Sequence, residues 1–254
     1  MTPLSDEQLD RYARHLVLRE IGGAGQAAIR AATVAVIGAG GIGAPVLQYL
    51  AAAGVGRLVI VDDDVVSLSN LQRQVIFDSA DVDVSKAARA GDRVTAINPD
   101  VAVTVVAQRI NADNATASLT GADVIVDGSD NFATRLTVAD TAHALRIPLV
   151  SAAIGQFHGQ LATWRGWEAD QPCYRCYVGD AHDSDDCDSC ADVGVLGAMT
   201  GVMGSYAALE AIRCIFSFGE RQAGKLHIID GLAPSMRSIR MPKDPGCRTC
   251  SVVR

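Results

Sequence analysis

The sequence predicts an α/β protein built on a doubly wound, mostly parallel sheet with an antiparallel extension toward the C-terminus. Three observations predict this class: apolar strand-like runs alternate with helical stretches, a glycine-rich turn follows the first run, and from about Gln160 strand-like runs follow one another. Parallel strands need crossover helices, so the alternation indicates a sheet with helices on both faces. Consecutive strands favour antiparallel pairing within the same sheet.

The N-terminal segment is expected to be helical. Ser5, with Gln8 three residues later, forms a capping-box pattern, in which the two residues satisfy the first backbone N–H groups of a helix. We therefore predict a first helix from about residue 6 to the Gly22–Gly23 pair, where glycine breaks the helical pattern.

The parallel part of the sheet is predicted from five apolar runs. They lie at residues 33–38, 57–62, 101–109, 122–128 and 148–153. The helices expected between them lie at 44–53, at 85–97 with Ser85 as its cap, after residue 109, and at 131–145. The carboxyl ends of parallel strands meet at one edge of a sheet, and ligands bind there.

The antiparallel extension is predicted from three further runs, at 160–165, 225–230 and 235–241. The apolar tract 193–218 lies between them, and it carries Glu210 and Arg213. We interpret it as a buried helix, because its uncharged part is marginal for a membrane span. We expect residues 1–254 to form a single domain with an N-terminal helical segment (1–30), a nucleotide-binding half (31–155) and a second half (156–254).

Composition and charge exclude several classes of function. Hydrophobic residues make up 49% of the chain and charged residues 20%, which is typical of a compact protein and not of a disordered one. A formal charge of -7 argues against binding to nucleic acid or to an anionic membrane. The opening residues lack a basic leader and an apolar signal core, which predicts a cytoplasmic location. In that reducing compartment, the seven cysteines favour metal ligation or reactive thiols over disulfides.

The glycine-rich turn points to a nucleotide. Gly38, Gly40 and Gly43 read GxGxxG between a strand and a helix, and Asp62 ends the next strand 19 residues after the last glycine. Such glycines let phosphate approach the backbone N–H groups at a helix N-terminus, which is the Rossmann-like arrangement. Asp62 can accept hydrogen bonds from ribose hydroxyls, which NAD and ATP both carry.

The loop DDDVVSLSNLQRQ, residues 62–74, favours ATP. Attack on an α-phosphate builds negative charge that cations must offset, and Arg73 and Lys86 are placed to do so, with Asn70 and Gln72 as neutral donors. Hydride transfer has no such need. Asp130, at the start of a helix, either caps that helix or holds Mg²⁺. Asp127 is an equal candidate for the magnesium.

These residues resemble a known family. GAGGIG (38–43), DDDVVSLSNLQRQ, Lys86, the Asp130–Asn131 pair and INPD (97–100) look like the bacterial ThiF/MoeB branch of the ubiquitin-activating superfamily. The resemblance implies an ATP-dependent adenylyltransferase that activates the C-terminal Gly-Gly carboxylate of a ubiquitin-like sulfur carrier. The nucleotide and magnesium residues so implied are Gly38, Gly40, Gly41, Gly43, Asp62, Ser69, Asn70, Leu71, Gln72, Arg73, Lys86, Asp130 and Asn131.

The resemblance also implies partners. Arg14 would reach into the site of a neighbouring subunit, which implies a homodimer, and 156–254 would bind the carrier. DDDVVSLSNLQRQVIF and IIDGLAPSMRSIRM are closer to ThiF, which implies a ThiS-like carrier and thiamine biosynthesis. A MoaD-like carrier and molybdopterin are the alternative. The chain ends just after Cys250, so a separate protein is expected to supply the sulfur. An NAD-dependent oxidoreductase and a non-catalytic zinc-bearing nucleotide sensor remain rival classes.

Six of the cysteines form three CxxC pairs. They are CYRC (173–176), CDSC (187–190) and CRTC (247–250). Structural zinc takes four thiolates, so two pairs make one site and one pair is left over. Spacing alone also permits CYRC with CDSC. The family pattern joins Cys173 and Cys176 to Cys247 and Cys250, which implies a zinc-bound tail.

The remaining pair lies in an acidic loop. The family pattern places a cysteine before an xxGV segment, and Cys190 holds that place here, which implies a covalent intermediate with the carrier or a part in sulfur transfer. Cys187 departs from the family pattern, and the acids at 183, 185, 186 and 188 raise a thiol pKa. A reversible Cys187–Cys190 disulfide and two inert thiols are the alternatives.

Overall fold

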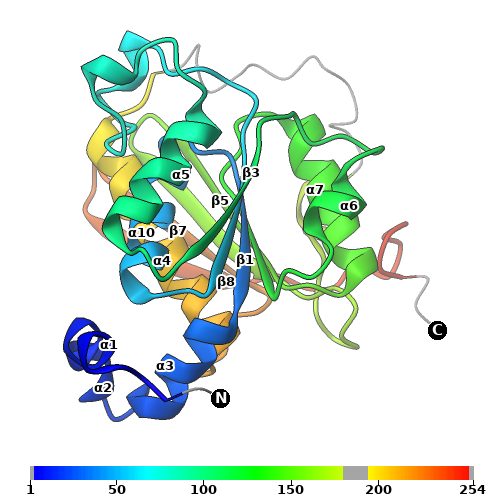
Figure 1. Cartoon of the computed structure of the whole chain (residues 1–254). Coiled ribbons are helices and arrows are strands. Elements are labelled where there is room, and N and C mark those ends of the chain that lie inside the picture. The colour runs from blue at the N-terminus through cyan, green and yellow to red at the C-terminus, as the bar shows by residue number, and fades with distance from the viewer. Residues whose placement is uncertain (1–2, 180–193, 252–254) are drawn as a thin grey trace.

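One eight-stranded sheet organises the whole molecule (Figure 1). The computed structural model describes residues 3–179 and 194–251. The strand order is β3-β2-β1-β4-β5-β6-β7-β8, so the chain starts at the centre and winds outward in both directions. This is the doubly wound sheet that the sequence predicts.

The first five strands are parallel, as predicted. They are β1 (Thr33–Ile37), β2 (Arg57–Val61), β3 (Ala102–Val106), β4 (Val124–Asp127) and β5 (Leu149–Gly155). β1 and β4 are buried along nearly their whole length, because helices cover both faces. The carboxyl ends of β1, β2 and β4 lie side by side and carry the glycine turn, Asp62 and residues 128–131.

The last three strands are antiparallel, as predicted. They are β6 (His158–Trp164), β7 (Lys225–Asp230) and β8 (Ser235–Arg240). β6 turns back directly from β5, with Leu149 opposite Trp164 and Gly155 opposite His158. The sheet therefore continues without a break from residues 31–155 into residues 156–254.

Helices cover the two faces of the sheet separately (Figure 1). One face carries α4 (Gly43–Ala53), α5 (Lys86–Ile97) and α10 (Gly197–Ile215), and the other carries α6 (Ala115–Leu119) and α7 (Phe132–Leu145). The apolar tract is thus a buried helix, as predicted. A Cβ on Gly204 of α10 would lie 2.2 Å from Pro45 Cγ of α4, so glycine lets the two helices touch. None of the helices described has the length and hydropathy that a membrane span requires.

Short helical segments lie in the loops. Among the described residues they include the single turns η1 (Leu68–Asn70) and η2 (Ser79–Asp81), and α8 (Tyr174–Val178) in the CYRC segment. Ser85 caps α5 as predicted, since its Oγ accepts from the Ala88 N–H.

The N-terminal helix begins as predicted but ends much earlier. Ser5 and Gln8 form the capping box of α1 (Asp6–Arg11), and a second short helix, α2 (Ala13–Leu16), follows. The break lies at Tyr12, which is 2% exposed and whose hydroxyl accepts from Asn98 Nδ2 at 2.9 Å. Burying this ring against the C-terminal end of α5 turns the chain, and the sequence pattern does not record that contact.

The Gly22–Gly23 pair starts a helix instead of ending one. α3 spans Gly22–Ala31. A Cβ on Gly25 would lie 2.9 Å from Ile21 Cγ2 and 3.0 Å from Phe216 Cδ1, so glycine allows α3 to pack closely against the chain that follows α10. Tertiary packing outweighs the poor helix propensity of glycine here, and the prediction of a helix end at this pair is wrong.

Candidate functional site

A pocket of about 670 Å³ opens at the carboxyl ends of β1, β2 and β4. Eleven of the residues predicted for nucleotide and magnesium binding contribute to its wall. They are Gly38, Gly40, Gly41, Asp62, Ser69, Asn70, Gln72, Arg73, Lys86, Asp130 and Asn131. The fold therefore brings three separate loops to one cavity, at the edge where ligands bind in sheets of this kind.

The glycine turn forms one wall of the pocket. Gly38 has a φ of +85°, and a Cβ there would lie 3.3 Å from the carbonyl carbon of Gly128, so the turn requires glycine. α4 starts directly after it without a side-chain cap. Within α4 itself, the Ala44 N–H donates to the Gly40 carbonyl and Pro45 has no N–H. The backbone that faces the pocket at this helix start is that of Gly40 and Gly41, where the helix dipole favours an anion.

Asp62 stiffens this turn from the neighbouring strand. Its Oδ2 accepts from the Ala39 N–H at 2.7 Å, and its Oδ1 accepts from the Asp64 N–H at 2.9 Å. Burial raises the pKa of Asp62, and the two N–H groups and the charge of Lys86 offset only part of that effect. The carboxylate is thus placed at the pocket wall and titrates above the ordinary range of an aspartate.

Lys86 and Arg73 bring positive charge to the pocket. Lys86 is the first residue of α5; its side chain is 7% exposed, and its Nζ lies 2.8 Å from Asp64 Oδ2. Arg73 donates from Nη1 to the Ser69 carbonyl at 3.0 Å, within its own loop. A buried ammonium interacts strongly with a charge that enters the pocket, because little water screens the interaction.

The structure separates the two aspartates that follow β4. Asp127 is buried, accepts from the Ser129 N–H at 2.9 Å and is not part of the pocket wall. Asp130 lines the pocket. Asn131 caps α7, because its Oδ1 accepts from the Thr134 N–H at 2.9 Å. The helix-capping interpretation of Asp130 is therefore wrong, and Asp130 is an exposed residue of the pocket wall.

Three predicted residues lie away from the pocket wall. Gly43 and Leu71 do not line the pocket: a Cβ on Gly43 would lie 1.8 Å from the Gly38 carbonyl oxygen, and Leu71 packs against the hydrophobic core. Both serve the shape of the turn and loop. Arg14 is exposed on α2, at the end of the molecule opposite to residues 62–74 (Figure 1). Cys190, with Cys187, lies outside the described residues.

The pocket wall also contains residues that the sequence did not indicate. Gln74 and Ser129 are buried there, and neither Gln74 Oε1 nor Ser129 Oγ has a hydrogen-bond partner among the described residues. Thr200, from α10, donates to the Gly197 carbonyl at 2.6 Å and lies 3.2 Å from the Arg73 carbonyl. Gln74 is the last residue of the loop 62–74, so the loop motif could have indicated it. Nothing local marks Thr200, which is far away in the sequence.

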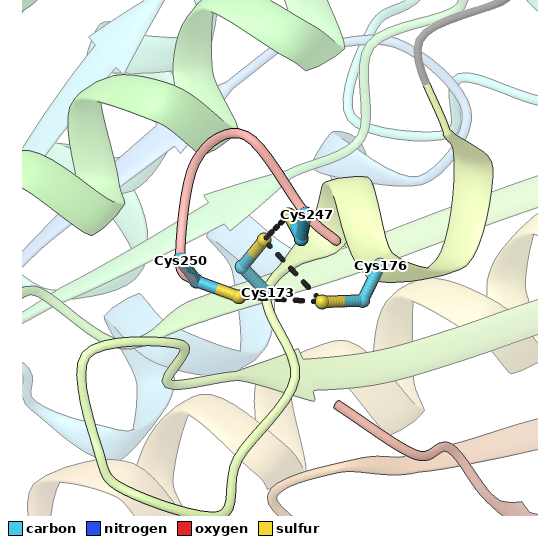
Figure 2. Close-up of side chains that lie close together, drawn as sticks. All are labelled: Cys173, Cys176, Cys247 and Cys250. Atoms are coloured by element: carbon cyan, nitrogen blue, oxygen red, sulfur yellow. Dashed lines mark hydrogen bonds between the residues drawn. The ribbon is translucent and has the colours of Figure 1, made fainter. Parts of the chain in front are cut away.

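Four cysteines gather at a second site, next to α7 (Figure 2). Cys173 and Cys176 come from the CYRC turn, and Cys247 and Cys250 from the CRTC turn. Their sulfur atoms all lie within 4.8 Å of one another, with 3.5 Å between Cys173 and Cys247 and 3.3 Å between Cys176 and Cys250. The pairing that the resemblance implied, CYRC with CRTC, is confirmed.

This donor set fits a structural zinc ion. Four thiolates at about 2.3 Å from zinc in a tetrahedron lie about 3.8 Å apart, and Cys173 and Cys176 are 3.8 Å apart here. None of the four is in a disulfide. Burial raises the pKa of Cys173; it also opposes ionisation of Cys247, but the N–H groups of Cys250 and Thr249 bring the pKa of Cys247 below its ordinary value.

The ThiF family model aligns with residues 12–249, which is nearly the whole chain. The chain belongs to the ThiF family. Three curated relatives agree with this ThiF-family assignment, and each is named for an adenylyltransferase. The sulfur carrier protein adenylyltransferase of Thermus thermophilus is 42% identical and covers 96% of this chain and 91% of its own.

The other two relatives are named for two different systems. The sulfur carrier protein ThiS adenylyltransferase of Escherichia coli is 39% identical over 97% of this chain and 97% of its own. The molybdopterin-synthase adenylyltransferase of Salmonella typhimurium is 35% identical over 98% of this chain and 99% of its own. Among solved structures, E. coli MccB with ATP superposes with a TM-score of 0.82, covering 95% of this chain and 74% of its own. At 23% identity it supports the fold alone.

Proposed function

We propose that this ThiF-family chain is an ATP-dependent adenylyltransferase that activates the C-terminal Gly-Gly carboxylate of a ThiS-like sulfur carrier. The observation that carries the proposal is the gathering of Arg73, Lys86 and Asp130 around the pocket that the glycine turn 38–41 also lines. This set matches a triphosphate with its magnesium. The names of the relatives support the choice of reaction.

Each wall of the pocket has a role in this proposal. The backbone of Gly40 and Gly41, at the start of α4, holds phosphates, and Asp62 accepts from the ribose hydroxyls. Asn70 and Gln72 donate to phosphoryl oxygens or to the carrier. Asp130 holds Mg²⁺, which neutralises phosphate charge when bound and for which carboxylate oxygen is a preferred ligand.

The reaction needs little covalent help from the protein. A carboxylate oxygen of the carrier attacks the α-phosphorus of ATP, a new C–O–P bond forms, and the bond to the β-phosphate oxygen breaks with release of pyrophosphate. Negative charge increases on the α-phosphoryl oxygens, and Arg73 and Lys86 offset it. The pocket holds both reactants in line, which removes much of the entropic barrier. Sulfur from a separate donor protein then displaces AMP.

Other parts of the chain complete the proposal. The four cysteines hold Zn²⁺ and fasten the C-terminal residues to the rest of the fold. Arg14 acts in the pocket of the second subunit of a homodimer in the cytoplasm. Cys190 takes part in sulfur transfer. A MoaD-like carrier is the alternative substrate, favoured by the relative named for molybdopterin synthase.

The direct test is exchange of labelled pyrophosphate into ATP, run with a ThiS-like carrier, with a MoaD-like carrier and without carrier. We expect exchange with the ThiS-like carrier only. Exchange with the MoaD-like carrier alone would reassign the substrate. An NAD-dependent oxidoreductase or a nucleotide sensor would give no exchange with either carrier, and the oxidoreductase would bind NAD tightly.

A further inference from the structure

One carboxylate connects the two cysteine turns. Asp140, on α7, accepts from Arg175 of the CYRC turn: Nε donates to Oδ1 at 2.9 Å, and Nη2 donates to Oδ2 at 2.8 Å. Its Oδ1 also accepts from Thr249 Oγ1 of the CRTC turn at 3.4 Å. Arg175 stands between Cys173 and Cys176, and Thr249 between Cys247 and Cys250. Both halves of the cysteine site are therefore fastened to the same side chain.

The stronger of these links is well suited to fix a geometry. The Arg175 side chain is 7% exposed, whereas that of Asp140 is 41% exposed. A bidentate arginine–carboxylate pair holds both groups in one plane, which a lysine cannot do. The weaker bond from Thr249 brings the second turn to the same carboxylate. The sulfur atoms thus converge through contacts that do not involve a metal.

The same helix also forms part of the pocket. The cap of α7, Asn131, lies about two and a half turns before Asp140. Arg135, in the first turns of the helix, lines the pocket. Arg135 donates to the carbonyl oxygens of Ser129, in the pocket wall, and of Ala152, in β5. Burial raises the pKa of Tyr174, from the CYRC turn, and the charge of Arg135 offsets part of that effect. The hydrogen bonds of Arg175 and Thr249 therefore connect the cysteine site to Asp140 of α7, and α7 continues to the pocket.

We propose that Asp140 is a positioning residue that holds the two cysteine turns ready for metal, and that α7 couples metal binding at this site to nucleotide binding in the pocket. The second half of the inference rests on the proposed function, because it requires that the pocket binds ATP. The first half concerns the metal alone.

The first test measures zinc affinity of the metal-free protein under reducing conditions, by competition with a chromogenic chelator. Replacing a residue that orients metal ligands typically weakens metal binding by about 10- to 100-fold. We expect about tenfold for Asp140→Asn and for Asp140→Ala, and a smaller loss for Thr249→Val. Asp92→Asn, an exposed carboxylate on α5, is the matched control and should leave the affinity unchanged. Circular dichroism verifies that each variant is folded.

The second test uses the reciprocity of coupled binding. If zinc strengthens ATP binding by some factor, ATP must strengthen zinc binding by the same factor. We expect the ATP Kd of the wild-type protein to rise several-fold when zinc is removed, and this response to shrink in both Asp140 variants.

Two results would overturn the inference. Zinc affinities of Asp140→Asn, Asp140→Ala and Thr249→Val all within twofold of wild type would remove the positioning role. Equal ATP affinity of the zinc-loaded and zinc-free wild type would remove the coupling. A wild-type protein that binds no ATP at all would instead contradict the proposed function, and the zinc measurement would still decide the role of Asp140.

Discussion

Replacement of Lys86 by methionine separates the chemistry of the pocket from its stability. Methionine keeps most of the volume of the lysine stem and removes the charge. Two charges about 4 Å apart interact by about 4 kcal/mol at an effective dielectric constant of about 20. The Lys86 side chain is 7% exposed, so this value applies better than the value for water. Loss of one preorganised group of this kind costs about 10²- to 10³-fold in rate.

Lys86→Met should cost little stability, because the ion-pair partner of Lys86 is well exposed to water. The partner of Lys86 is Asp64, whose side chain is 66% exposed, so its carboxylate is hydrated once the ammonium is gone. Removing one partner of an ion pair is costly when the other charge stays buried and unpaired, and Asp64 is not left in that state. Lys86→Met should therefore lose carrier-dependent pyrophosphate exchange by 10²- to 10³-fold while its Tm changes by only a few degrees.

The assay compares Lys86→Met with wild type and with Lys225→Met. Lys225 pairs with Glu220 and does not line the pocket, so it controls for the loss of a surface ion pair. Exchange by Lys86→Met within tenfold of wild type would refute the electrostatic reasoning. A large fall in Tm or in bound zinc would show instead that Lys86 supports the fold.

Three further predictions concern other groups of the site. Gln74→Leu should raise the Tm, because it removes a buried amide oxygen that has no partner among the described residues, and should lower exchange at least tenfold; a lower Tm with normal exchange would contradict this. Because the pKa of Asp62 is raised and ribose binding requires the carboxylate, ATP affinity should fall as the pH decreases through that pKa, above the ordinary range of an aspartate, and Asp62→Asn should abolish this limb of the pH profile. For Arg14, equal mixing of wild type with an Arg14→Ala/Lys86→Ala double variant should leave roughly a quarter of the sites complete if it acts across a dimer, against half if it acts within its own chain.

The parallel half of the fold could be predicted because its signals are local. Apolar runs bounded by glycine or by a cap determine β1, β2 and β4, and the capping patterns at Ser5 and Ser85 mark helix starts correctly. The early end of α1 could not be predicted in this way. It follows from the burial of Tyr12 against Asn98, which lies 86 residues away in the sequence.

The same distinction holds for the candidate site. Residues that belong to one loop, such as Asn70 and Arg73, share a motif that the sequence displays. The sequence could not decide between the two interpretations of Asp130, because only the structure shows that Asn131 is the residue that caps α7. Thr200 comes from a distant helix and Asp140 acts through Arg175, so no spacing along the chain reveals either residue.

The most direct test of the proposed chemistry is mass spectrometry of the carrier after rapid acid quench of enzyme, ATP and Mg²⁺. The proposal predicts a carrier that has gained AMP at its C-terminal glycine and that loses this AMP on treatment with hydroxylamine. A carrier that lacks its last two glycines should not form the adduct. A carrier of unchanged mass under conditions where the pocket is saturated with ATP would contradict it.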